Sequence, residues 1–294
     1  MKLLKIVLAL QVLLGVTLIA LVATDSVPFA DGDDADDARP ARPAVDRFDS
    51  AAAWRLLRDQ VELGPRPAGS QASRRLAESL RGLLPDGRFQ AVPGGLRNVI
   101  GTVAGREPGY IVVGAHYDTK DIDGFVGAND GAGGTAVVTE LARTVKRPKH
   151  TIHFVLFDGE ESPRGTDDAR FAEEGLRGSK VAARRFRRAR AMVNIDFVAD
   201  KRLRIPREGL SNLRLWGRLR AAARRVGAAR SFPDETQGAI QDDHLPFLRV
   251  GVPAIDLIDF DFNCWHRTCD DLSAVSERSL DASGETVLEL IRRL

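Results

Sequence analysis

Residues 110–118 carry the sequence YIVVGAHYD. The first six residues form a short, continuous apolar run rich in β-branched side chains, which predicts a strand buried on both faces of a sheet. A second run of this kind, TIHFVLF at 151–157, is followed at once by DGEE. Each predicted strand therefore ends in side chains that can bind a metal ion. Because the carboxyl ends of parallel strands meet at one edge of a sheet, this pattern indicates both the fold and the position of a site.

Further strands and helices extend this pattern in both directions along the chain. Apolar residues recur at helical spacing on either side of the two runs, and the alternation of such helices with buried-type strands predicts an α/β domain with a mostly parallel sheet. The predicted strands are 96–103, 110–115, 151–157, 191–197 and 252–258, and the predicted helices are 51–61, 71–84, 133–145, 181–190 and 279–294.

Length and composition suit an ordinary globular protein. The chain has 294 residues, with 43 Lys and Arg against 41 Asp and Glu, and 44% of its residues are hydrophobic. These values exclude a largely disordered chain, a protein with several membrane spans and a small disulfide-stabilised domain. The near-balanced charge gives no reason to expect a nucleic acid as a partner. We expect the protein to act as a monomer.

The N-terminus differs in kind from the rest of the chain. Lys2 and Lys5 precede an apolar run of roughly 18 residues, a length between that of a signal-peptide core and that of a membrane helix. We therefore expect residues 1–24 to be a cleaved signal peptide or a single membrane anchor. In both cases the rest of the protein is extracytoplasmic, either secreted or anchored, and it meets a membrane only through this segment. The stretch 25–47 is expected to be a flexible acidic and proline-containing linker, so the folded domain is predicted to span 48–294.

Side chains that can bind metal gather where the predicted strands end. A lone carboxylate at such a position is usually a helix cap, but this many at one sheet edge are hard to explain as capping. Paired carboxylates without nearby cations repel unless a metal ion or a shared proton neutralises them. With imidazole and carboxylate donors, zinc is the expected metal. The residues concerned are His116, Asp118, Asp130, Asp158, Glu160, Glu161, Asp196 and His266.

The two adjacent acids Glu160 and Glu161 can serve different purposes. Because neighbouring side chains need not share a direction, one can bind the metal while the other faces a substrate as a general base. The glycine-rich stretch GANDGAGG at 127–134 allows another interpretation, a phosphate-binding loop, but it has neither a GxGxxG nor a GKT/S pattern. We therefore favour the metal site.

In combination, these motifs resemble those of the clan MH zinc enzymes, which include zinc aminopeptidases and glutaminyl-peptide cyclotransferases. The similar motifs are AHYDTK, FVGANDGAGG, FDGEE, NID and CWHRTCDD. The resemblance implies a single three-layer α/β domain of the zinc-exopeptidase type, with a twisted mixed sheet flanked by helices. It also implies that Asp130, Glu161 and His266 bind zinc. In the aminopeptidases Asp130 would bridge to a second zinc held by His116 and Asp196, whereas cyclotransferases typically use one zinc.

Several details resemble the cyclotransferase branch more closely, above all the stretch IQDDHLPFLR and Trp265. This resemblance implies conversion of the N-terminal Gln of a peptide or protein to pyroglutamate, with release of ammonia. Glu160 would move a proton from the substrate amine to the ammonia. Asp196 and Asp242 would share a hydrogen-bonded carboxylate network with it, which raises its pKa. Trp265 would form an apolar wall for the substrate side chain.

Two alternatives stay open beside cyclisation. All five ligands of a two-zinc site are present, so the protein could be an aminopeptidase that hydrolyses the first peptide bond. In that reaction Glu160 would deprotonate a zinc-bound water molecule. A non-catalytic binding protein on the same fold is the third possibility.

Two features are expected to hold the site in place. Asp118 follows His116 by two residues and is expected to orient its ring, as carboxylates commonly do for metal-binding histidines. Cys264 and Cys269 bracket Trp265 and His266. In an oxidising compartment a short disulfide could fix this loop, although the spacing alone leaves open whether the two cysteines are bonded.

Overall fold

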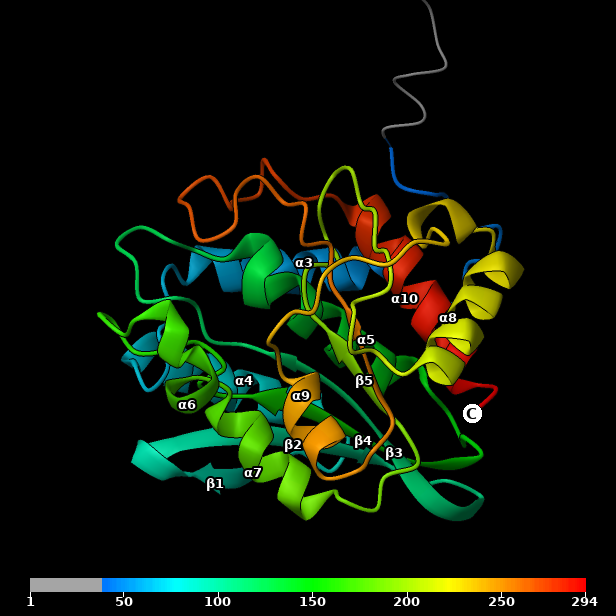
Figure 1. The fold of residues 1–294 in the computed structure, drawn as a ribbon, viewed down its shortest axis with the longest axis horizontal. Coiled ribbons are helices and arrows are strands. Elements are labelled where there is room, and N and C mark those ends of the chain that lie inside the picture. Colours follow the sequence, from blue (N-terminus) through cyan, green and yellow to red (C-terminus); the bar gives the residue numbers. More distant parts are fainter. Residues whose placement is uncertain (1–38) are drawn as a thin grey trace, which may run out of the picture. The chain divides into compact units, whose positions relative to one another are not determined.

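The computed structural model describes residues 39–294 and contains one mixed sheet of six strands in the order β1-β2-β4-β3-β5-β6 (Figure 1). β4, β3, β5 and β6 are parallel to one another, and β2 is antiparallel to both of its neighbours. The expected mixed, mostly parallel sheet is therefore confirmed. The strands are β1 (Arg88–Val92), β2 (Leu96–Val103), β3 (Glu107–His116), β4 (His150–Phe157), β5 (Met192–Ile195) and β6 (Ala254–Leu257).

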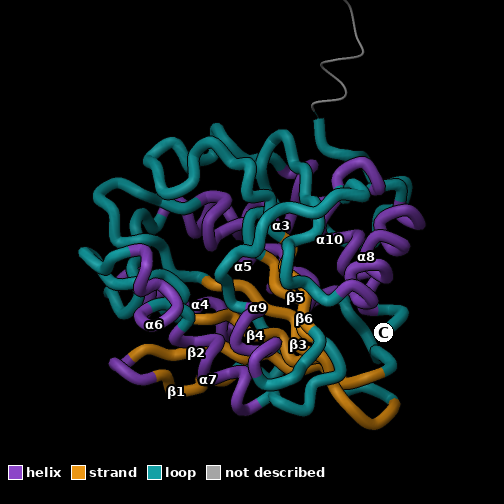
Figure 2. Tube along the Cα trace, in the orientation of Figure 1, coloured by secondary structure: helices purple, strands orange, loops and turns teal. Residues whose placement is uncertain are grey.

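Helices cover both faces of the sheet, which gives the three layers visible in Figure 2. Successive residues of a strand point to opposite faces. Val113 accordingly belongs to an apolar cluster that includes residues of α3, α4, α5, α8 and α10, whereas its neighbour Val112 belongs to a second cluster with residues of α7 and α9. The helices are α3 (Ser50–Glu62), α4 (Gln71–Leu83), α5 (Gly134–Thr144), α6 (Phe171–Glu174), α7 (Arg177–Arg185), α8 (Leu213–Val226), α9 (His244–Arg249) and α10 (Glu277–Ile291).

All five predicted strands are present, but the helices differ in part from the prediction. The helix expected at 181–190 is α7, which begins at Arg177 and ends at Arg185. It ends there because Phe186 leaves the helical conformation and Arg190 donates its backbone N–H to the carbonyl of Tyr110, which starts the return to the sheet. β1, α8 and α9 are not among the elements predicted from the sequence.

The segment before α3 is packed on the domain, although the sequence assigns it to a flexible linker. Ala41 is buried and donates its N–H to Ser231 Oγ at 3.0 Å, and Arg47 Nη1 lies 3.1 Å from Glu289 Oε2. Apolar contact and charge pairing thus hold residues 40–47, so the domain begins before the predicted boundary at 48. The predicted signal peptide or anchor at 1–24, and most of the predicted linker, lie outside the described residues.

No helix within residues 39–294 combines the length and the apolar character needed to cross a bilayer.

Candidate functional site

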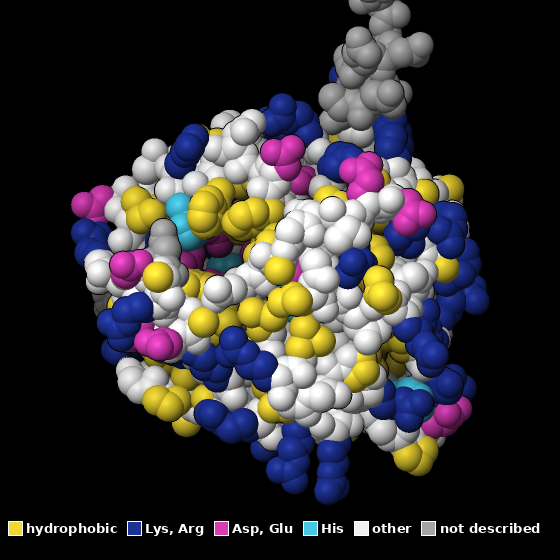
Figure 3. Space-filling view, in the orientation of Figure 1, with side chains coloured by type: hydrophobic (Ala, Val, Ile, Leu, Met, Phe, Trp, Pro, Cys, Tyr) yellow, Lys and Arg dark blue, Asp and Glu magenta, His cyan; other side chains and the backbone are white. Residues whose placement is uncertain are grey.

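The loops at the carboxyl edge of the parallel strands bring most of the predicted metal-binding side chains together. They surround a hollow with acidic and histidine side chains at its floor and hydrophobic side chains at its rim (Figure 3). His266, whose side chain is 23% exposed, lies nearest to solvent, and the others are buried. In chain order the contributors are His116 at the end of β3, Asp130 in the irregular turn η2 (Ala128–Gly133), Glu160 and Glu161 after β4, Asp196 after β5, and His266 after β6.

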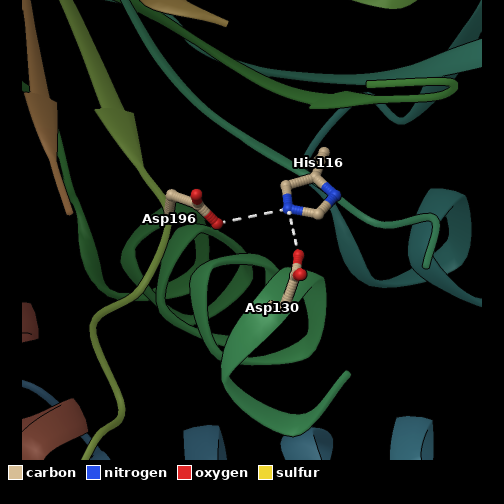
Figure 4. A group of neighbouring side chains, drawn as sticks. All are labelled: His116, Asp130 and Asp196. Carbon is tan, nitrogen blue, oxygen red and sulfur yellow. Dashed lines mark hydrogen bonds and ion pairs between the residues drawn. The ribbon is translucent and has the colours of Figure 1, made fainter. Parts of the chain in front are cut away.

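His116 lies between two carboxylates (Figure 4). Its Nε2 is 3.2 Å from Asp130 Oδ1 and 3.2 Å from Asp196 Oδ1, and its Nδ1 is 3.0 Å from the backbone carbonyl oxygen of Asp118. A carbonyl can only accept, so Nδ1 carries a hydrogen and donates it. Nε2 therefore faces the two carboxylates either as a second N–H donor or as a metal ligand. Burial disfavours the charged ring, but hydrogen bonds to Asp130 and Asp196 outweigh it and raise the pKa of His116 well above its usual value.

A second ligand group shares Asp130 with the first. His266 Nε2 is 3.1 Å from Glu161 Oε1 and 3.5 Å from Asp130 Oδ2. Within each group, His116–Asp130–Asp196 and Asp130–Glu161–His266, the donor atoms lie within 4.8 Å of one another. Asp130 Oδ2 is buried and has no hydrogen-bond partner among the described residues, as expected of an oxygen that binds a cation. Imidazole and carboxylate donors in this number fit zinc.

The backbone around Asp130 is held in an irregular conformation. Gly131 adopts φ 95°, a region that favours glycine, and a Cβ there would lie 2.8 Å from the carbonyl oxygen of Asp118. Asp270, which follows the His266 loop, accepts hydrogen bonds from the N–H groups of Asn129 at 2.7 Å and Asp130 at 3.0 Å. The loop that delivers His266 therefore also fixes the turn that delivers Asp130.

The sequence predicts that the Asp118 carboxylate orients the ring of His116, but the structure shows a different arrangement. The nearest carboxylate oxygen of Asp118 is 3.9 Å from His116 Nδ1, and the backbone carbonyl of Asp118 accepts from the ring instead. The Asp118 carboxylate accepts hydrogen bonds from the backbone N–H groups of Gly159 at 2.9 Å, Glu160 at 3.2 Å and Glu161 at 3.2 Å. It thus holds the turn that presents the two acids. Burial is the main cause that raises the pKa of Asp118 to about 7.

Glu160 and Asp196 are buried carboxyl groups with raised pKa values. Burial, followed by the charge of Glu161, raises the pKa of Glu160 well above its usual range, and Asp242 adds to the effect. Burial, followed by the charge of Asp242, likewise raises the pKa of Asp196. In both groups the protonated form is thus favoured relative to an exposed carboxyl group, which suits a residue that transfers protons.

Asp242 lines the same pocket and is tied to the sheet by an asparagine. Asn194 Nδ2 donates to Asp242 Oδ2 at 2.8 Å and to Asp256 Oδ1 at 3.0 Å. Burial, followed by the charge of Asp242, raises the pKa of Asp256 well above its usual range. Glu160, Asp196 and Asp242 thus all line the same pocket.

Aromatic and aliphatic side chains form the walls of the pocket, which has a volume of about 270 Å³. Trp265 is 43% exposed; its ring stacks on that of His266 at 4.6 Å and contacts that of Phe260 at 5.1 Å. The structure joins Cys264 and Cys269 in a disulfide that closes the loop around Trp265 and His266. The apolar wall residues are Phe171, Phe197, Ile240, Ile258, Phe260 and Trp265.

Three polar residues at the site are not singled out by the sequence analysis. Lys120 Nζ lies 3.1 Å from Glu161 Oε2 and lines the pocket, Asp270 holds the Asp130 turn, and Asn194 holds Asp242. Each belongs to a motif quoted above, AHYDTK, CWHRTCDD or NID. Their presence in these motifs could have marked them as site residues. Their partners could not be predicted, because the fold determines which atoms meet.

Comparison with known proteins gives relatives of two kinds. The chain is 29% identical to a glutaminyl-peptide cyclotransferase of Bothrops jararaca, over 75% of this chain and 74% of that protein. A leucine aminopeptidase precursor from Bacteroides thetaiotaomicron is similar in structure, with a TM-score of 0.77 and 27% identity over 86% of this chain and 99% of that chain. A glutaminyl cyclase from Porphyromonas gingivalis has a TM-score of 0.75 and 28% identity over 85% of this chain and 99% of that chain.

The sequence profile of Peptidase family M28 matches residues 98–291, a segment that runs from β2 to the end of α10 and includes all the metal-type residues described above. This segment is well over half of the chain, and the chain therefore belongs to Peptidase family M28.

Proposed function

We propose that the protein is a zinc-dependent glutaminyl-peptide cyclotransferase, which converts the N-terminal Gln of peptides to pyroglutamate and releases ammonia. Glu160 carries the proposal: it is a buried carboxyl group with a raised pKa, placed in a pocket beside a zinc-type ligand group and two further carboxyl groups. A group that takes a proton from an amine and returns it to ammonia needs such a pKa. Similarity to the cyclotransferase of Bothrops jararaca and the cyclase of Porphyromonas gingivalis supports this reaction.

The donor atoms of Asp130, Glu161 and His266 would hold the zinc ion. A zinc ion bound there would polarise the γ-carboxamide carbonyl of the substrate and stabilise the negative charge that develops on its oxygen. Three protein ligands leave a coordination position for the substrate. Lys120, which pairs with Glu161, fixes the orientation of that carboxylate.

Glu160 carries the proton during the reaction. It accepts a proton from the α-amine as the amine nitrogen attacks the carboxamide carbon of the same glutamine. The new C–N bond closes the lactam ring, the bond to the carboxamide nitrogen breaks, and Glu160 returns the proton so that ammonia leaves. Burial and the negative charge of Glu161, with a further contribution from Asp242, keep the Glu160 carboxyl group able to hold that proton. Asp196, whose pKa is raised by burial and by Asp242, would complete the carboxyl network beside it. Trp265 packs against the methylene groups of the substrate and excludes water.

Aminopeptidase activity is the second candidate, and one observation favours it. His116, Asp130 and Asp196 form a complete second ligand group that shares Asp130 with the first. Two zinc ions at such a pair of groups are suited to activate water for hydrolysis of the first peptide bond. The similarity to the leucine aminopeptidase precursor of Bacteroides thetaiotaomicron supports this alternative.

The identity of the product decides between the two reactions. The full-length protein is incubated with zinc and a peptide that begins with Gln, and the product is identified by mass spectrometry. Loss of ammonia with every residue retained supports cyclisation, whereas release of the first residue contradicts it and supports the aminopeptidase. A matched peptide that begins with Ala is the control, because it has no carboxamide to cyclise and is changed only by hydrolysis. A protein that binds these peptides and turns over neither of them would be a binding protein.

Dependence on zinc is tested separately. A chelator is expected to abolish activity, and added zinc is expected to restore it. The number of zinc ions per restored chain is then measured by metal analysis, since one ion fits the cyclotransferase and two fit the aminopeptidase. Full activity in the chelated protein would contradict the role of zinc.

A further inference from the structure

Behind the pocket wall, a buried histidine lies between two buried carboxyl groups. His244, the first residue of α9, has its Nε2 at 3.2 Å from Glu208 Oε2 and its Nδ1 at 3.6 Å from Asp256 Oδ2, and all three side chains are fully buried. A neutral imidazole has one N–H group, so it can donate to only one of these carboxylates. Nε2 lies at hydrogen-bonding distance from Glu208, whereas the 3.6 Å between Nδ1 and Asp256 is longer than a hydrogen bond and is an electrostatic contact. Since unpaired buried charges are costly, the three groups form one unit.

Glu208 connects this unit to the wall of the pocket. Its Oε1 accepts hydrogen bonds from the N–H groups of Ile240 at 3.0 Å and Leu210 at 2.9 Å, and its Oε2 accepts from Ser211 at 2.8 Å. Ile240 lies in the pocket wall, next to the wall residues Ala239, Gln241 and Asp242. A single buried carboxylate therefore fixes the backbone of the segment that faces the substrate.

Asp256 connects the unit to Asp242. Asn194 Nδ2 donates to Asp256 Oδ1 at 3.0 Å and to Asp242 Oδ2 at 2.8 Å, so a displacement of Asp256 also changes the position of Asp242. The donor atoms of Asp242, His244 and Asp256 are close enough to surround a metal ion. However, the Asn194 NH2 group already donates hydrogen bonds to both carboxylates and would point its hydrogens toward a cation bound there. The cluster is therefore better suited to hydrogen bonding than to metal binding.

We propose that Glu208 and His244 are positioning residues for the reaction. Glu208 holds the pocket wall at Ile240, and His244 links Glu208 to Asp256 and thereby sets the orientation of Asp242. The inference rests on the proposed function, in which Asp242 supports proton transfer by Glu160.

Two substitutions of His244 separate its two contacts. The amide nitrogen of Gln lies near the position of Nε2, so His244→Gln keeps a donor for Glu208 and loses the electrostatic contact with Asp256. His244→Asn does the reverse, because its amide nitrogen lies near the position of Nδ1. Both break the connection between Glu208 and Asp256 and are expected to lower kcat by about 10-fold to 100-fold, the usual effect of losing a supporting polar contact at an active site. KM should stay within about twofold, because Glu208 still binds the Ile240 N–H.

Glu208→Gln is expected to raise KM as well as to lower kcat, because an amide cannot accept at both of its terminal atoms. Glu285→Gln is the matched control. Glu285 is also fully buried, accepts backbone N–H groups of Arg47 and Phe48, and pairs with the Arg47 side chain, but it lies outside the pocket lining. It is expected to lower the melting temperature without changing kcat or KM. Zinc content and melting temperature are measured for every variant.

An unchanged kcat in both His244 variants would overturn the proposal, as would an equal fall of kcat in Glu285→Gln. Failure of the proposed function has a different signature, because the wild-type protein would then form no pyroglutamate. In that case the same variants are compared in the reaction that the wild type does perform. If it performs none, the comparison uses the dissociation constant of the Gln peptide, measured by calorimetry. A several-fold weaker affinity in Glu208→Gln, with Glu285→Gln unchanged, supports the positioning of the wall, and equal affinity contradicts it.

Discussion

Asp118 binds the backbone of Glu161, with its Oδ2 at 3.2 Å from the Glu161 nitrogen. The same carboxylate also accepts the N–H groups of the two preceding residues, Gly159 and Glu160. Asp118 therefore controls the placement of both Glu161, a predicted zinc ligand, and Glu160, the proposed proton carrier. A buried anion that accepts three backbone N–H groups leaves those groups little freedom.

Asp118→Asn is expected to weaken zinc binding and activity together, by about 10-fold to 100-fold. The amide can accept at its oxygen only, and its NH2 group would face backbone N–H groups that have lost their acceptor. Zinc affinity is measured by competition with a chromogenic chelator. Asp49→Ala, which removes the side-chain cap of α3, is the control: it should cost about 1 kcal/mol of stability and leave zinc affinity unchanged. Equal zinc affinity in Asp118→Asn and the wild type would show that the turn holds its shape without this anion.

Glu160→Gln is expected to bind zinc normally and to lose about 100-fold to 10,000-fold in kcat, because the amide keeps the size of the side chain but cannot carry the proton. Product formation is followed by mass spectrometry, and zinc content by metal analysis. Glu173→Gln, whose side chain is exposed on α6, should match the wild type in both. Activity that survives in Glu160→Gln would assign the proton transfer to another group.

The Cys264–Cys269 disulfide closes the loop that carries His266. Replacing both cysteines with serine is expected to lower the free energy of unfolding by about 2 kcal/mol, from the entropy regained by a short loop in the unfolded chain. Zinc should also be released faster, because His266 is then held less firmly. Urea unfolding and the rate of zinc transfer to a chelator measure the two effects. An unchanged rate of zinc release would mean that Asp270 and the packing of Trp265 suffice to hold the loop.

Asp259 gives stability a dependence on pH. Burial, followed by the neighbouring charge of Asp200, raises its pKa from 3.8 to about 7. The folded protein thus binds this proton more tightly than the unfolded chain. The resulting stabilisation is complete below about pH 4 and is lost as the pH rises to about 7. The stability of the wild type relative to Asp259→Asn should therefore fall between about pH 4 and about pH 7, measured by urea unfolding. A stability difference that stays constant over this range would contradict the role of Asp259.

The strands could be predicted because they are buried on both faces, which leaves a continuous apolar run such as TIHFVLF. Most of the residues that can bind metal could be predicted because they stand at or directly after the end of such a run, as His116, Glu160 and Asp196 do. α8 could have been predicted as well, because its buried side chains, such as Leu215, Leu219 and Val226, recur at helical spacing with arginines between them.

The supporting contacts could not be predicted, because they depend on which atoms meet in space. The spacing of His116 and Asp118 does not distinguish a carboxylate from a backbone carbonyl as the partner of the ring. Glu208 and His244 lie in separate segments, and only the fold brings them within 3.2 Å. Asp270 was overlooked for the same reason, since the N–H groups that it accepts belong to a turn far away in the sequence.

The position of β3 between β4 and β5 has a consequence for the order of folding. The ligands follow β3, β4, β5 and β6, so the zinc site exists only after strands from distant parts of the chain have paired. Contacts between such distant segments form late, because closing long loops is entropically costly. Zinc is therefore expected to leave the rate of folding unchanged and to slow unfolding, as an interaction made only after the transition state does. A bound zinc ion would thus stabilise the native sheet kinetically, and its loss would shorten the lifetime of the native protein.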